Sequence, residues 1–153
     1  MKIALFILSA LILSGCAASG QNFSGLEPIS ETEGKVYLYR PYNFFQGGTW
    51  PTVFINGEKR FTLKNQGYLV LSLPAGQYDL KIGKSHFFAN WMFDDVEGKL
   101  IIEPNKIYYL KLDIAFEDLQ AYGTVMSMSG SVGLISIPET HALKDLKELK
   151  SSM

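Results

Sequence analysis

Residues 35–41 read Lys-Val-Tyr-Leu-Tyr-Arg-Pro, and this stretch decides the fold class. Successive side chains of a β-strand point to opposite faces of a sheet, and β-branched and aromatic residues suit such positions. Pro41 ends the run, because a proline has no N–H for the hydrogen bonds between strands. The stretch predicts a β-strand, and the short alternating runs that follow it predict a β-rich domain.

Turn residues interrupt the rest of the chain at intervals of roughly 8–12 residues, as in sandwiches and barrels. Asn56-Gly57 is the clearest hairpin signal, because both turn positions require positive φ. Residues 103–105 and 129–131 are each expected to separate two paired strands. About eight or nine short strands are predicted, in an antiparallel β-sandwich or open barrel. After residues 36–40, the alternating runs are 52–55, 60–63, 68–73, 78–82, 99–102, 107–114, 122–128 and 132–137.

After Pro138 the spacing of apolar residues changes from that of a strand to that of a helix. Proline suits a first helical turn, and Glu139 lies where the helix dipole favours negative charge. A C-terminal helix of about three turns is too short to be stable alone, so we expect its apolar stripe to pack on the domain. Docking to a partner is the alternative. The stripe consists of Ala142, Leu143, Leu146 and Leu149.

An apolar run at residues 3–13 leads into Leu13-Ser14-Gly15-Cys16. As a helix this run would reach about 17 Å, far short of the roughly 30 Å of a bilayer core, but it suits a signal peptide. Its end resembles the lipobox of bacterial lipoprotein signal peptides. That resemblance implies removal of residues 1–15 and attachment of acyl chains, palmitate among them, to Cys16. The alternative for Cys16 is an ordinary free or buried thiol.

The resemblance to lipoproteins also implies an address. In Gram-negative lipoproteins an Asp after the cysteine resembles an inner-membrane retention signal, whereas Ala17 follows here. The outer membrane, on its periplasmic face, is therefore the expected location in such a cell. Residues 16–34 are expected to form a lipid-anchored tether of about 23 Å if flexible, followed by one domain at 35–150. Packing of this segment as an edge strand, through Phe23 and Leu26, is the alternative.

Composition limits the classes of partner. The formal net charge is −1, and loss of Lys2 with the leader would make it −2, so no basic face for nucleic acid is implied. Cys16 is the single cysteine, which excludes a disulfide framework, a redox motif and a cysteine-rich zinc site. The expected partners are the membrane, through the acyl chains on Cys16, and an envelope protein.

The strand at residues 36–41 is followed by a loop at 42–51 that contains Gly47-Gly48, and later by Leu-Pro-Ala-Gly-Gln-Tyr at 73–78. A strand with paired tyrosines follows at residues 107–110. This order resembles a family of uncharacterised bacterial lipoprotein domains, classed as a domain of unknown function, that opens with a V-Y-x-Y-R-P strand. The resemblance covers about residues 35–150. It implies a fold and a location, and it carries no established chemistry.

Catalytic and metal-binding chemistry has little support in the sequence. The two histidines, His86 and His141, stand in an aromatic stretch and in the expected helix, and no nucleophile elbow is present. Asp94-Asp95-Val96-Glu97 lacks the ligand spacing of an EF-hand loop and is interpreted as a solvated turn. We therefore expect a non-enzymatic protein with no metal and no cofactor.

Two loops, at residues 42–51 and 86–93, are unusually aromatic for connections between strands. They either complete the core at an open end of the sandwich or form an apolar patch, which requires both loops at the same end. The expected function is a non-catalytic interaction or structural module, and the alternative is a binding protein for an apolar or peptide ligand at these loops. Arg40 is expected to cap a carbonyl or pair with a carboxylate. The candidate binding residues are Phe44, Phe45, Trp50, Phe87, Phe88, Trp91 and Phe93.

Overall fold

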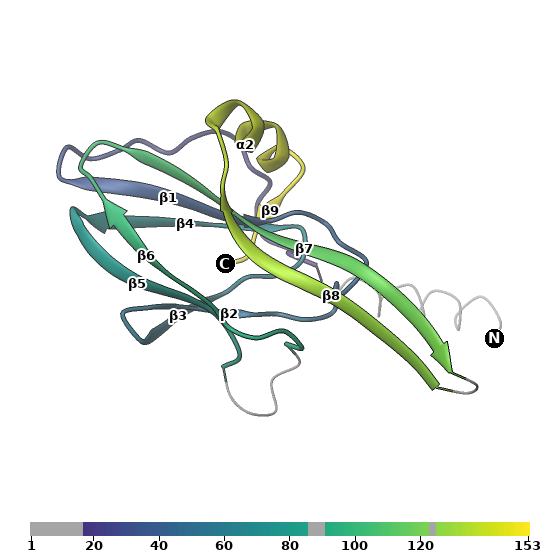
Figure 1. Cartoon of the computed structure of the whole chain (residues 1–153). Helices are drawn as coiled ribbons and strands as arrows, with labels where there is room; N and C mark the ends of the chain where they lie inside the picture. The colour runs from purple at the N-terminus through teal and green to yellow at the C-terminus, as the bar shows by residue number, and fades with distance from the viewer. Residues whose placement is uncertain (1–16, 86–90, 123–124) are drawn as a thin grey trace, which may run out of the picture.

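Two stacked β-sheets form the body of the protein (Figure 1). The computed structural model describes residues 17–85, 91–122 and 125–153, with only the backbone for 118–122 and 125–128. The first sheet has the order β8-β7-β1-β4-β9 and the second the order β3-β2-β5-β6; neither closes into a barrel, which confirms the mainly β sandwich. The first comprises β1 (Glu33–Arg40), β4 (Gly67–Pro74), β7 (Ile107–Tyr122), β8 (Val125–Ser136) and β9 (Lys150–Ser151). The second comprises β2 (Thr52–Ile55), β3 (Glu58–Thr62), β5 (Gly76–Gly83) and β6 (Val96–Ile102), and helix α2 (Glu139–Leu146) precedes β9.

Strand β1 lies in the middle of the first sheet and is buried on both faces. Val36 and Leu38 point between the two sheets, into a core that includes Val53 of the second sheet. Tyr37 and Tyr39 point to the opposite face, because side chains alternate along a strand. These four side chains are all fully buried. The strand that begins the domain is thus also its most enclosed one.

Helix α2 covers the outer face of the first sheet. Ala142 and Leu146 of the helix are buried in one cluster with Tyr37 and Tyr39, so the apolar stripe packs on the domain as expected. The hydroxyl of Tyr39 donates a hydrogen bond of 3.0 Å to the carboxylate of Asp145, which joins the helix to β1. Among the residues described, no helix is long and apolar enough to cross a bilayer.

The pairing of the strands differs from the expectation in two places. Two pairs within the sandwich are parallel, β1 with β7 and β4 with β9. The expected pairing of residues 99–102 with 107–114 is wrong, because β6 pairs with β5 in the second sheet while β7 pairs with β1 in the first. The turn between them is a corner between sheets, where the Asn105 N–H donates to the carbonyl of Glu33 at 2.9 Å. A turn has the same composition in a hairpin and in such a corner.

The two hairpins also test the predicted turns. Asn56 and Gly57 have φ values of 53° and 78° and join β2 to β3, as predicted. The expected pairing of residues 122–128 with 132–137 is wrong, because residues 125–136 form one strand, β8, which pairs with β7. In this hairpin β7 has 16 residues and β8 has 12. The predicted break at residues 129–131 is wrong: these residues pair with β7, which has a bulge between Phe116 and Asp118. Figure 1 shows this long hairpin projecting beyond the rest of the sandwich.

Residues 17–34 follow the surface of the domain and do not form the free coil that their polarity predicted. The Ala18 N–H donates to the carbonyl of Asn65 at 2.8 Å, and the Phe23 N–H donates to that of Leu149 at 3.1 Å. The Phe23 ring stands edge-on to Tyr37 at 6.1 Å between centroids, so the segment also contributes to the outer apolar cluster. Packing of Phe23 on Tyr37 is the physical reason why this segment stays on the domain. The proposed boundary between residues 15 and 16 stays a prediction.

The buried hydroxyl of Tyr39 predicts a loss of stability at alkaline pH. Burial, and then the Asp145 carboxylate, raise the pKa of Tyr39 above its usual value of 10. The unfolded chain therefore loses this proton first, and stability that is complete below pH 10 falls as the pH rises above it. We expect Tyr39→Phe to cost about 1–3 kcal/mol at pH 8 and less at pH 11, measured by urea unfolding.

The matched control is Tyr42→Phe, since the Tyr42 side chain is exposed. Its free energy of unfolding at pH 8 is expected to stay close to that of the unsubstituted protein. An equal difference at pH 8 and pH 11 for Tyr39→Phe would contradict the prediction.

Candidate functional site

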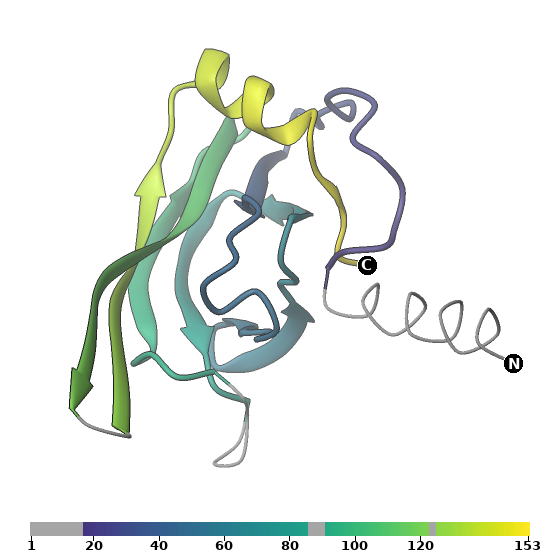
Figure 2. The ribbon, with the colours of Figure 1, turned by 90° about the vertical axis from the view of Figure 1, so that its right-hand side faces the viewer.

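The described parts of the two aromatic loops lie together at one end of the sandwich. Figure 2 looks onto this end, where the loop at residues 41–51 faces the viewer. The ring of Phe45, from this loop, is 6.1 Å from Phe93 of the other loop and 5.4 Å from Phe116 of β7. Trp91 continues the row, with its ring 5.2 Å from that of Phe93. The two loops therefore lie at the same end of the sandwich, as a shared aromatic patch requires.

The predicted residues divide between core and surface. Trp91 is fully buried, and Phe45 and Phe93 are partly buried against the main core, so these three complete the open end of the sandwich. Phe44 and Trp50 face outward, with 89 % and 40 % of their surfaces exposed. Phe87 and Phe88 lie outside the described residues. Only the first aromatic loop, among the described residues, therefore presents predicted binding residues to solvent.

Arg40 holds the 41–51 loop in place. Its guanidinium, in a residue only 1 % exposed, donates hydrogen bonds of 2.7 Å to the carbonyls of Thr49 and Gln46. It also lies 6.0 Å from the ring centroid of Trp91, within range of a cation–π contact. Burial lowers the pKa of Arg40 to about 10, which leaves the group charged at neutral pH. The capping of carbonyls is the structural role expected of Arg40.

Asn65 is a second support that the sequence did not reveal. Its buried side chain accepts a hydrogen bond from the Asn43 N–H and donates one to the Asn43 carbonyl, both at 3.0 Å. Asn43 in turn donates from its side chain to the carbonyl of Ile114 at 2.6 Å. The backbone carbonyl of Asn65 accepts from Ala18, as described above. Asn65-Gln66-Gly67 has the composition of an ordinary turn, so no pattern distinguishes this asparagine.

The hollows beside the loop are small. One of about 100 Å³ is bounded by residues 40–43 and 111–114, and another of about 250 Å³ lies between Tyr42 and the end of α2. Pockets that enclose drug-sized ligands measure roughly 300–1,000 Å³. Neither of these two hollows, both lined by described residues, would enclose such a ligand.

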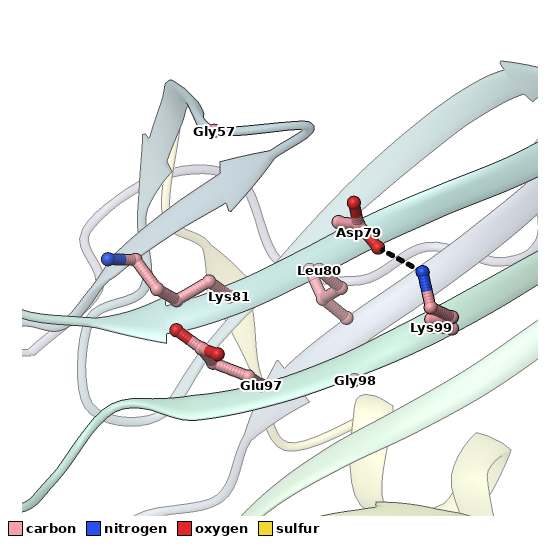
Figure 3. Close-up of a pocket in the computed structure, with 7 residues that line it drawn as sticks. All are labelled: Gly57, Asp79, Leu80, Lys81, Glu97, Gly98 and Lys99. Carbon is pink, nitrogen blue, oxygen red and sulfur yellow. Dashed lines mark hydrogen bonds and ion pairs between the residues drawn. The ribbon is translucent and has the colours of Figure 1, made fainter.

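A larger hollow, of about 530 Å³, lies over β5 and β6 (Figure 3). Its charged side chains alternate in sign across the two strands, and Lys99 pairs with Asp79 at 2.9 Å. Lys81 is engaged with Asp95 at 3.2 Å and lies 4.8 Å from the ring centroid of Phe54. In each of these ion pairs the two opposite charges neutralise each other, on the exposed face of the second sheet. The residues that line the hollow are Gly57, Asp79, Leu80, Lys81, Glu97, Gly98 and Lys99.

The residues considered for catalysis and metal binding do not converge within the described part of the chain. His141 is exposed on α2, and His86 lies outside the described residues. Asp95, from the acidic stretch, pairs with Lys81 and accepts a hydrogen bond of 3.0 Å from the Lys84 N–H. No group of three or more His, Cys, Asp or Glu side chains among the described residues is placed to hold a metal ion.

Packing of Phe45 on β8 predicts different effects for two glycines of that strand. A Cβ added at Gly130 would overlap the Phe45 ring and the Ala115 carbonyl, whereas one added at Gly133 would meet nothing within 4 Å. We expect Gly130→Ala to lower the free energy of unfolding by about 1–3 kcal/mol and Gly133→Ala to leave it nearly unchanged. Thermal and urea unfolding of both variants check this, and equal effects of the two would contradict the packing.

The family of the chain follows from its match to a family model. No curated protein matches this sequence. Residues 30–125 match the family described as "Protein of unknown function (DUF2846)", a span that runs from just before β1 to the start of β8. The match covers more than half of the 153 residues and leaves α2 and β9 outside it. The chain belongs to this family of proteins of unknown function.

Proposed function

We propose that this protein is a lipid-anchored, non-catalytic module of the bacterial cell envelope. The leader supports the anchor, since Leu13-Ser14-Gly15-Cys16 ends an apolar run of signal-peptide length. Two or three acyl chains on Cys16 would hold the domain on the membrane, because each buried methylene adds about 0.8 kcal/mol. With Ala17 next in the chain, the outer membrane facing the periplasm is the proposed address in a Gram-negative cell.

The sequence Leu13-Ser14-Gly15-Cys16 is the observation that carries the proposal, and the position of Ala18 is compatible with it. The Ala18 N–H donates to the carbonyl of Asn65, so the folded domain extends to within two residues of Cys16. Residues 17–23, which would follow the proposed cleavage site, pack on the domain, so a mature chain that begins at Cys16 would keep these contacts.

Replacing the proposed attachment residue tests the anchor. We expect Cys16→Ser to abolish acylation and cleavage of the leader, since the thiol is the group that is modified, and to remove the mature protein from the membrane fraction. Labelling with a fatty acid, the mass of the mature chain and fractionation measure this. Ser14→Ala, which keeps a small residue before the cleavage point, is the control and should behave as the unsubstituted protein. Unchanged processing and membrane association of Cys16→Ser would refute the anchor.

The 41–51 loop supports a second candidate, a binding protein for an apolar or peptide ligand. Its exposed Phe44 and Trp50 belong to a loop that Arg40 and Asn65 hold in place. Aromatic side chains on a rigid loop lose little entropy on binding and commonly anchor interfaces. Two hollows that described residues line beside this loop are too small to enclose a drug-sized ligand, which favours the interaction module over this alternative in the described part of the chain.

Recovery of what the native protein carries separates the two candidates. For the interaction module we expect crosslinking in intact envelopes, followed by purification, to yield one envelope protein in stoichiometric amount. For the ligand-binding protein, organic extraction of the purified, uncrosslinked chain should instead yield a stoichiometric small molecule or peptide by mass spectrometry. A stoichiometric ligand with no protein partner would overturn the interaction module.

A further inference from the structure

We infer that the 41–51 loop lies on the membrane surface, with Phe44 and Trp50 in the region where headgroups meet acyl chains. This inference rests on the proposed acylation of Cys16 and adds an orientation to it. The domain would then lie close to the bilayer, with the surface of this loop turned toward the lipid (Figure 2). The partner of this surface is the bilayer that carries the anchor.

A short connection joins the proposed anchor to the loop. Ala17, one peptide bond from Cys16, forms a β-bridge with Asn65. The side chain of Asn65 holds the backbone of Asn43, whose next residue is Phe44. Consecutive Cα atoms are about 3.8 Å apart, so an acylated Cys16 cannot lie far from this network. The ordered contacts of residues 17–23 remove the slack that a flexible tether would have supplied.

Several exposed apolar side chains lie on or beside the 41–51 loop. Phe44, Trp50 and Tyr42 all stand exposed on this one loop. Met92, 70 % exposed, joins them through its sulfur, which lies 2.9 Å from the side-chain nitrogen of Gln46. Tryptophan and tyrosine favour the boundary between membrane and water, where an apolar ring and a polar edge are both satisfied.

The 41–51 loop has no charged side chain of its own. Residues 41–51 contain no Asp, Glu, Lys or Arg, so no charge of the loop itself would have to leave water on contact with lipid. Arg40, which contacts the loop from within, is already buried, and its guanidinium is bonded to the carbonyls of Thr49 and Gln46.

The proposed covalent anchor favours the bilayer as the partner of this surface. A loop tied to the bilayer by a short chain is exposed to a high effective concentration of lipid, so a weak affinity for the membrane surface is enough to keep the loop in place. A protein partner would have to displace that contact. The anchor and the uncharged aromatic loop thus act as two signals, the second of which sets orientation.

A fluorescent probe on the acylated full-length protein tests this placement. Acylation consumes the thiol of Cys16, so Phe44→Cys provides a single site for the polarity-sensitive dye NBD. The protein is reconstituted into vesicles of phosphatidylethanolamine and phosphatidylglycerol. We expect the emission of the probe to shift to the blue on reconstitution and to be quenched by lipids that carry a shallow spin label.

Ile101→Cys is the matched control, because Ile101 is also well exposed but lies at the other end of the sandwich. It pairs with Gln77 of β5, whereas Thr52, next to the loop, pairs with Gly83. Six residues of β5 separate these positions, about 20 Å along the strand. A probe at residue 101 should show neither the blue shift nor the quenching.

The outcomes separate this inference from the proposed anchor. Flotation of the acylated protein with vesicles reports the anchor alone. If the protein floats and the probe at residue 44 stays as water-exposed as the probe at 101, the orientation is wrong and the anchor stands. If no acylation occurs and the protein does not float, the proposed function itself fails. Equal quenching at both positions would also overturn the orientation, since it would mean that the domain has no preferred face.

Discussion

The burial of strand β1 on both faces is the constraint on which the rest of the structure depends. Val36 and Leu38 bind the two sheets together, while Tyr37 and Tyr39 receive α2 and the N-terminal segment. Full burial of an aliphatic side chain contributes roughly 1.5–3 kcal/mol, so a strand with no exposed apolar residue is worth more than an edge strand of equal length. The second sheet therefore packs on one face of this strand, and α2 and the N-terminal segment pack on the other.

Arg40 carries that constraint from the core into the loop. It is the last residue of β1, and its position is fixed by the strand it ends. A buried guanidinium must find acceptors, and here it takes the carbonyls of Thr49 and Gln46. These bonds tie the second half of the loop to the end of β1, while Phe44, in the first half, is exposed to solvent.

Local patterns in the sequence predicted the elements well and their partners less well. The β1 stretch, the Asn56-Gly57 hairpin and the stripe of α2 each depend on residues close together in the chain. The pairing of β7 with β1 and the corner at residues 103–105 depend on which sheet each strand joins, which alternation does not encode. The site divides in the same way. Arg40 was identifiable as a charge at the end of a strand, whereas Asn65 functions only through contacts distant in sequence.

The packing of residues 17–34 on the domain bears on the role of the aromatic loop. With a flexible tether, the domain would rotate freely above the membrane and an exposed Phe44 would be available to any partner. With Ala18 bonded to Asn65, and Asn65 to Asn43, the proposed anchor and the loop belong to the same end of the molecule. In the proposed orientation, the uncharged, aromatic loop would meet lipid before it meets protein. The surfaces left for an envelope partner would then be those turned away from the bilayer, such as the charged outer face of β5 and β6.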